Sequence, residues 1–274
     1  MTVKAERLGR SIDRAYQWAF RSFLVLAYAF LALPIVLILL MALNAGELLE
    51  FPPKGMSLRW FVALFDSEIF IKAILTSLQV AAVATCVSGL LGTAAALYFV
   101  RHAHRFREAL RVLMIAPLLL PEILTAIALL FFVHQIGVGN RGGFGLYVGH
   151  TMITLPFVFL NVSAVLYNFD RSIELAARSL GGRTWTVFRR ITLPMIKPGV
   201  FAGCMFAFVV SFDLFAVSLL LKGIGQSTIP IQLYDYLRWD FDPLAAAVSS
   251  VSILISLGVV LLADRIVGLR ALRF

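Results

Sequence analysis

The sequence predicts an all-α membrane protein that crosses the bilayer six times. Hydrophobic residues make up 61% of the 274 residues and charged residues only 14%, and the mean hydropathy is +0.92. A soluble domain usually has about 45–50% apolar and about 25% charged residues, so a soluble globular fold is excluded. The high hydrophobicity also excludes a disordered chain. With two cysteines, the chain has neither a disulfide scaffold nor a cysteine-rich metal site.

Six stretches are long enough to span a membrane, which requires roughly 20 mainly apolar residues. They cover residues 23–43, 74–100, 112–133, 146–167, 198–221 and 244–266. The first exceeds the apolar region of a signal peptide, about 7–15 residues, so we expect it to be retained. The predicted organisation is an N-terminal arm (1–22), a transmembrane domain (23–267) and a tail (268–274).

The distribution of basic residues predicts the orientation in the membrane. The arm, the loops after the second and fourth spans, and the tail together carry 18 of the 24 lysines and arginines. Basic residues accumulate on the cytoplasmic side, so both termini are predicted to be cytoplasmic. The net charge of +9 is therefore a topology signal, and a nucleic-acid partner is not expected.

The cytoplasmic loop from Arg171 to Pro198 contains two predicted helices and no span. Ile173, Ala176, Ala177 and Leu180 follow the i, i+3, i+4, i+7 spacing of an amphipathic helix. Gly181 and Gly182 end this helix, and a second short helix follows with Trp185 and Phe188 on one face. A basic helix lying on anionic lipid is the alternative interpretation of this pattern.

The spacing in this loop resembles that of a known family. Ala176-Ala177 is followed by three residues and Gly181, then by nine residues, Ile191 and Leu193-Pro194. This is similar to the Glu-Ala-Ala signature in the membrane subunits of binding-protein-dependent ABC importers. The glutamate of the signature falls on Leu175 here, with Glu174 one place earlier. Glycine permits a sharp turn at position 181.

The resemblance implies a type I ABC importer permease fold in which the loop at about 171–194 carries a cytoplasmic coupling helix. The implied contact with an ATPase subunit involves Glu174, Ala176, Ala177, Gly181, Ile191, Leu193 and Pro194. The chain has no Gly-x-x-x-x-Gly-Lys-[Ser/Thr] phosphate loop. It is therefore expected to be a transport subunit and no enzyme, without a cofactor of its own, with ATP and Mg on the partner ATPase.

A narrower resemblance covers most of the chain. The motifs are Phe51-Pro52-Pro53-Lys54-Gly55, Pro117-Leu118-Leu119-Leu120-Pro121-Glu122-Ile123 and Ser211-Phe212-Asp213. They look like the second membrane subunit of spermidine/putrescine importers. The resemblance implies a small polar, often cationic solute, an inner-membrane location, and three kinds of partner: a second homologous permease subunit, an ATPase dimer and a periplasmic binding protein.

Two carboxylates, Glu122 and Asp213, lie within predicted spans. A charge there costs a few kcal/mol unless it faces protein or water. The pair Pro117 and Pro121 should break the third span, and Thr125 lies one turn beyond Glu122 on the same face. Glu122, Asp213 and Thr125 are the candidate solute path, with the two carboxylates as transient counter-charges for a cation. The alternative is structural: each carboxylate caps a broken helix or pairs with a partner subunit.

The remaining candidates rest on weaker patterns. Gln79, Thr151 and Thr154 are polar residues in spans that either line the path or join helices. Asp235, Asp240 and Asp242 in the third outer loop are candidates for docking the binding protein, or belong to a solvated loop. No metal spacing and no catalytic set is found. The rival function is a standalone ion-coupled transporter that uses Glu122 or Asp213; it gives no reason for the spacing from Ala176 to Pro194.

Overall fold

The computed structural model describes residues 2–102, 106–139 and 141–267, which form helices and loops with no β-strand in these ranges. The α-helices are α1 (Thr2–Ala42), α2 (Arg59–Asp66), α3 (Glu68–Arg101), α4 (Arg107–Leu119), α5 (Glu122–Gln135), α6 (Phe144–Tyr167), α7 (Ser172–Ser179), α8 (Thr184–Val187), α9 (Leu193–Phe212), α10 (Ala216–Leu221), α11 (Ile229–Leu237) and α12 (Leu244–Val267). A 3₁₀ turn, η1 (Arg141–Gly143), precedes α6, and a π-helical turn, η2 (Phe188–Thr192), precedes α9. The predicted tail, 268–274, lies outside the described residues.

Each of the six predicted spans coincides with a helix or with a broken pair of helices. Five are single helical runs long and apolar enough to cross a membrane: α1 from Tyr16 onward, α3, α6, the run Thr184–Phe212 and α12. The sixth is the pair α4 and α5, which pass the same test together but are bent by 107°. The prediction of an all-α fold with six spans is therefore confirmed. Residues of the predicted arm continue the helix of the first span, since α1 begins at Thr2.

Two spans are interrupted. Helix α4 ends at Leu119 because Leu120 precedes Pro121, and the residue before a proline is disfavoured in the α conformation; Leu120 is extended, with φ −90° and ψ 144°. This break confirms the one predicted from the two prolines. The predicted fifth span, 198–221, is also divided, because α9 ends at Phe212 and α10 begins at Ala216. The second break contains no proline or glycine, so it carries no helix-breaking signal.

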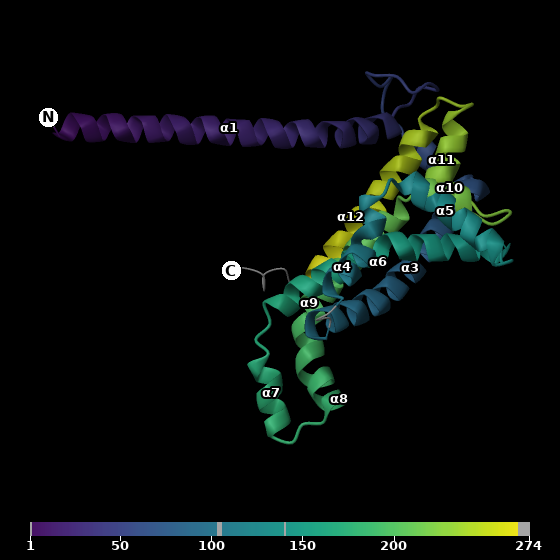
Figure 1. Ribbon diagram of the computed structural model, residues 1–274. Coiled ribbons are helices and arrows are strands. Elements are labelled where there is room, and N and C mark those ends of the chain that lie inside the picture. Colours follow the sequence, from purple (N-terminus) through teal and green to yellow (C-terminus); the bar gives the residue numbers. More distant parts are fainter. Residues whose placement is uncertain (1, 103–105, 140, 268–274) are drawn as a thin grey trace. The chain divides into compact units, whose positions relative to one another are not determined.

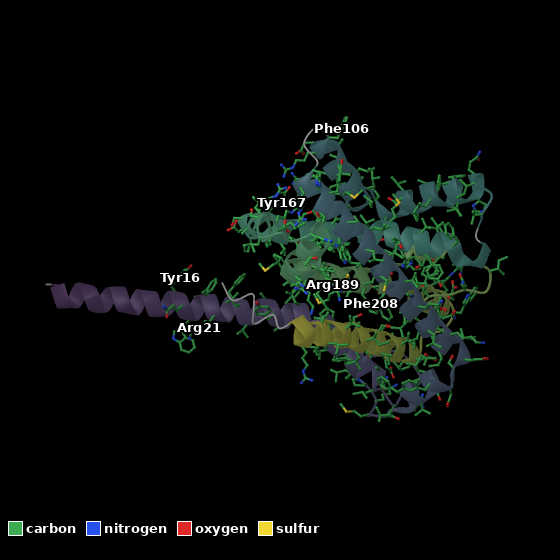
Figure 2. The ribbon with its side chains drawn as sticks, turned by 90° about the horizontal axis from the view of Figure 1, so that it is seen from below. Tyr16, Arg21, Phe106, Tyr167, Arg189 and Phe208 are labelled. Carbon is green, nitrogen blue, oxygen red and sulfur yellow. The ribbon has the colours of Figure 1, made fainter. Side chains whose placement is uncertain are left out.

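The chain forms two compact units. Unit 1 contains the residues up to Asp66 together with Asp240–Val251. Its small core is formed by Ala42, Ala246 and Ala247, with Ile38, Met41, Leu49, Trp60 and Phe61 packed around them. The buried Asn44 orders the following loop: its side-chain oxygen Oδ1 accepts hydrogen bonds from the backbone N–H groups of Gly46 and Lys54, both at 2.9 Å. From Tyr16 onward the apolar window of α1 buries no residue, and Tyr16 and Arg21 project from the helix (Figure 2).

Unit 2 contains Ser67–Trp239 and the residues from Ser252 onward. Its core is a three-helix contact of α3, α6 and α9, where Phe99, Val158, Phe159 and Ile196 are buried. Glycines of α3 and α9 allow a close approach to Val158 of α6: a Cβ added to Gly203 would lie 2.6 Å from the Val158 Cα. Small residues at such contacts let membrane helices pack closely.

The other helices of unit 2 surround this core. Helix α4 packs against α6, α10 packs against α5 and α6, and α11 packs against α3. Figure 1 shows the α7–α8 hairpin at one end of unit 2 and the group α5, α10 and α11 at the opposite end. The two regions predicted to carry function, the coupling loop and the broken spans, are therefore well separated within one unit.

Candidate coupling loop and solute path

The loop after α6 folds as a helical hairpin of α7 and α8, which confirms the two helices predicted there (Figure 1). Helix α7 begins beside Asp170, whose carboxylate accepts the backbone N–H of Ser172 at 2.9 Å. Hydrogen bonds from the backbone and the side chain of Ser172 lower the pKa of Asp170. The carboxylate is thus held in its charged form at the helix N-terminus, where a negative charge is stabilising.

The turn between the two helices requires glycine at two successive positions. The N–H of Gly181 donates to the carbonyl of Arg178 at 2.9 Å, and the N–H of Gly182 donates to that of Ala177 at 3.0 Å. These two hydrogen bonds form a Schellman motif, in which the residue just after the helix cap adopts a left-handed conformation. Gly181 is that residue, with φ +85°. A Cβ on Gly182 would lie 2.6 Å from the Ala177 carbonyl oxygen. Backbone geometry therefore fixes both glycines.

The outer surface of the hairpin presents apolar and small side chains. Ala176 is exposed, Leu180 is 89% exposed at the tip, and Trp185 is 68% exposed. Large apolar side chains displayed on a short projecting hairpin are typical of a contact with another protein. Of the predicted small-residue face, Ala176 is therefore accessible, whereas Ala177 is half-buried.

Glu174 differs from the rest of the predicted coupling set because its side chain is buried. Its carboxylate forms an ion pair with Arg101 at the end of α3 and accepts a hydrogen bond from the Thr192 hydroxyl of η2. It is also the only α7 residue that is buried. Glu174 thus contacts this chain rather than an outside surface, and sequence reasoning did not foresee either partner.

The end of the signature, Ile191 to Pro194, forms the entry into α9. Proline lacks an N–H, and within a helix its ring crowds the carbonyl four residues earlier. The π-helical turn η2 lies immediately before Pro194, and its wider backbone bonds the Leu193 N–H to the carbonyl of Phe188. The π turn accommodates the proline in a continuous helical run. Leu193 and Pro194 are exposed and Ile191 is half-buried.

At the opposite end of unit 2, Glu122 joins the two broken spans. It is the first residue of α5, directly after the break, and its Oε1 accepts the backbone N–H groups of Ala216 at 3.0 Å and Val217 at 3.4 Å. These groups begin α10, the segment after the other break, and lack partners within their own helix. Glu122 therefore caps the start of α10, and its place on the solute path stays a prediction.

Asp213 lies in the second break and is the C-cap of α9. Its side chain is exposed, and in the described part of the chain no hydrogen bond to its carboxylate is found. Glu122 contacts the backbone of Ala216, three residues after Asp213, so the two breaks bring both predicted carboxylates into one region. Thr125, the third predicted residue, is buried one turn beyond Glu122, and its hydroxyl lacks a partner among the described residues.

A buried histidine at the second break was missed by sequence reasoning. His150 of α6 contacts Ser211 of α9 through Nδ1 at 2.8 Å and Ser218 of α10 through Nε2 at 2.9 Å. It thereby bridges the two halves of the fifth span. A lone histidine with no periodic partner carried no signal for this role, because both serines are more than 60 residues away in sequence.

A comparison with protein families shows which family the chain belongs to. Residues 88–271 match the family described as the binding-protein-dependent transport system inner membrane component. The chain belongs to this family. The matched range includes the hairpin, both helix breaks and the entry into α9.

Relatives with curated names extend the match to most of the permease. It is 32% identical over 227 residues to putrescine transport system permease protein PotI of Escherichia coli (strain K12), which covers 80% of each chain. It is 26% identical to spermidine/putrescine transport system permease protein PotC of Haemophilus influenzae, over 89% of this chain and 95% of that one. It is 31% identical to molybdenum transport system permease protein ModB of Mycobacterium bovis, over 74% and 81%.

A solved structure shows the same fold. The permease superposes with a TM-score of 0.71 on a chain of a bacterial alginate ABC transporter in complex with an alginate pentasaccharide-bound periplasmic protein. The sequences are 19% identical, and the match covers 94% of this chain and 96% of the other. The type I permease fold implied by the loop signature is confirmed. The chain is an ABC importer permease subunit, a class of transport protein rather than an enzyme, and family membership does not favour the standalone ion-coupled transporter.

The remaining predicted residues of the permease have separate positions. Thr154 of α6 is hydrogen-bonded to Ser88 of α3 at 2.7 Å, and Ser88 also donates to the Thr151 carbonyl, so these groups join helices. Gln79 is exposed on α3.

The three candidate docking residues are divided between the two units. Asp235 is exposed on α11 in unit 2, whereas Asp240 and Asp242 belong to unit 1. Asp242 accepts the Leu244 N–H at 2.9 Å and so caps the start of α12. Docking of a binding protein by these residues stays a prediction.

Proposed function

We propose that this permease moves a small polyamine-type cation from the periplasm to the cytoplasm by alternating access. Two of the relatives carry putrescine or spermidine in their names, and the fold is that of importer permeases. The observation that supports the solute class is the exposed carboxylate of Asp213 beside the second helix break. Glu122 is used by backbone N–H groups, whereas Asp213 is exposed and available as a counter-charge for a cation.

Energy for transport comes from a separate ATPase in this proposal. The exposed surface of α7 and the turn at Leu180 would seat in a groove of that subunit, which would bind ATP and Mg. A second homologous permease subunit would complete the path, and a periplasmic binding protein would deliver the solute. The alginate transporter, with its periplasmic protein, is an assembly of the kind proposed.

The proposed location is the bacterial inner membrane, with both termini in the cytoplasm. The supporting observation is the set of 18 basic residues in the segments assigned to one side. The α7–α8 hairpin lies on that side, where an ATPase would reach it. The broken spans lie at the other end of unit 2, nearer the periplasm.

The test is uptake by the purified complex in proteoliposomes with ATP on the side of the ATPase. We expect accumulation of labelled putrescine that requires ATP and the binding protein, is reduced by unlabelled spermidine, and persists when ion gradients are dissipated. Neutral amino acids serve as the control competitor and should have no effect. Uptake that follows an ion gradient without ATP would overturn the importer proposal. ATP-driven uptake of another solute, with none of putrescine, would overturn the solute class alone.

A further inference from the structure

The coupling helix is attached to the membrane helices by a buried polar cluster. The cluster consists of Arg101, Glu174 and Thr192, which come from the end of α3, from α7 and from η2. The side chains of Arg101 and Glu174 are 17% and 5% exposed. The three residues are separated by 73 and 18 positions in sequence, so the cluster ties together segments that the chain itself does not join.

This polar cluster holds α7 against the rest of unit 2, in place of an apolar core contact. An isolated helix of eight residues is not stable in water and needs tertiary contacts. The only buried α7 residue is Glu174, while Ile173, Leu175 and Leu180 are exposed. The polar cluster is therefore the main interior attachment of this helix, beyond its packing against α8 and η2.

A buried carboxylate is an expensive way to hold a surface helix. Taking two charges out of water carries a large desolvation cost, and a buried ion pair is often no more stabilising than apolar residues of the same size. Such pairs do impose a definite geometry, because each charge must keep its partner. The arrangement here fixes the direction of α7 relative to both α3 and η2, through directional bonds rather than through a deformable apolar contact.

We infer that the cluster Arg101–Glu174–Thr192 is the joint through which displacement of the coupling helix passes to the second and fifth spans. Glu174 is then a positioning residue that never contacts the ATPase itself. Because η2 continues directly into α9 and Arg101 ends α3, a movement of α7 displaces both helices together. This inference rests on the proposed coupling to an ATPase and adds the route inside this chain.

The test measures the number of ATP molecules hydrolysed per solute imported by the reconstituted transporter. Glu174→Gln removes the charge but keeps the shape of the side chain. We expect this variant to assemble and to hydrolyse ATP in response to the loaded binding protein, while imports per ATP fall about fivefold or more, the usual size of a coupling between sites. A structural role alone would lower hydrolysis and import together and leave their ratio unchanged, which would overturn the inference.

Two further variants sharpen the result. Arg101→Gln should reproduce the loss of coupling, and the double variant with Glu174→Gln should recover part of it, since no unpaired charge is then buried. Glu108→Gln, an exposed carboxylate on α4, is the matched control and should keep the wild-type ratio. Equal and additive losses in the two single variants and the double variant would contradict a shared joint.

A second measurement covers the case in which the variants transport nothing. Spin labels are placed at Ser179→Cys on α7 and Ala94→Cys on α3, both exposed positions, after replacement of Cys86 and Cys204. In the full complex the joint predicts one narrow distance distribution, unchanged between nucleotide-free and ATP-bound states, that broadens in Glu174→Gln. A distance that changes with nucleotide would overturn the joint. A wild type without ATP-driven uptake would instead remove the proposed function.

Discussion

At the scale of single residues, the two carboxylates of the broken spans divide their tasks. Glu122 accepts two backbone N–H groups at the start of α10, and Asp213 is exposed beside the same break. We expect Asp213→Asn to raise the KM for a cationic solute roughly tenfold, because a charge-assisted contact contributes about 1.5–3 kcal/mol. The protein should still assemble. The measurement is the concentration dependence of ATP-driven putrescine uptake in proteoliposomes.

Glu122→Gln is the control for that experiment. Glutamine keeps an oxygen that can accept the N–H groups of Ala216 and Val217, so the cap on α10 should survive and the KM should change less than in Asp213→Asn. If instead Glu122→Gln raises the KM as much as Asp213→Asn does, Glu122 is also a solute contact and the division of tasks is wrong.

Other single residues show which contacts the sequence predicts and which it does not. The prolines at 117 and 121 predict the break in the third span because their effect on the backbone is local. The ion pair between Glu174 and Arg101, and the hydrogen bonds of His150, join residues more than 60 positions apart. A pattern read along the chain has no access to such pairs, so Glu174 is predicted as an outward contact and His150 is overlooked.

At the scale of elements, the hairpin turn gives a sharp prediction. Gly181→Arg places a long side chain at a left-handed residue, and such a backbone costs about 1–2 kcal/mol for an L-residue. It also puts a bulky group at the tip of the proposed coupling surface, where a Cβ on Gly181 meets no neighbour in this chain. We expect normal membrane insertion and loss of ATP-driven uptake, measured by chain amount in membranes and by uptake assay.

The matched control is Gly137→Arg in the turn after α5. Gly137 has φ +75° and, like Gly181, no atom within 4 Å of an added Cβ, so the backbone strain is similar. It lies at the opposite end of unit 2. Uptake should therefore persist in this variant. If both variants lose uptake equally, backbone strain causes the loss, and the coupling surface is not needed to explain it.

The elements themselves were predicted with uneven success. Each span gives a long apolar run, so all six were placed from hydropathy. Helix α11 was not predicted, because its residues lie in an outer loop that is polar on average. Its start did carry a local signal: Thr228 precedes the helix and Pro230 lies in its first turn, and proline is favoured at that position.

At the scale of the whole molecule, the orientation of the chain decides whether the two functional regions are on the correct sides. The basic residues predict that the α7–α8 hairpin is cytoplasmic. We test this in a chain lacking Cys86 and Cys204, with one cysteine introduced by Ser179→Cys on α7 or by Ile224→Cys in the loop after α10. Ile224 is fully exposed in this unit, and Ser179 is exposed.

A membrane-impermeant maleimide added to cells with a permeabilised outer membrane should label the Ile224→Cys chain and spare the Ser179→Cys chain. Disruption of the inner membrane should make both chains reactive, because only the barrier has changed. The reverse labelling would place the hairpin in the periplasm, where no ATP is available to a partner subunit. In that case the coupling surface, the joint at Glu174 and the direction of transport would all have to be abandoned, since each depends on a cytoplasmic hairpin.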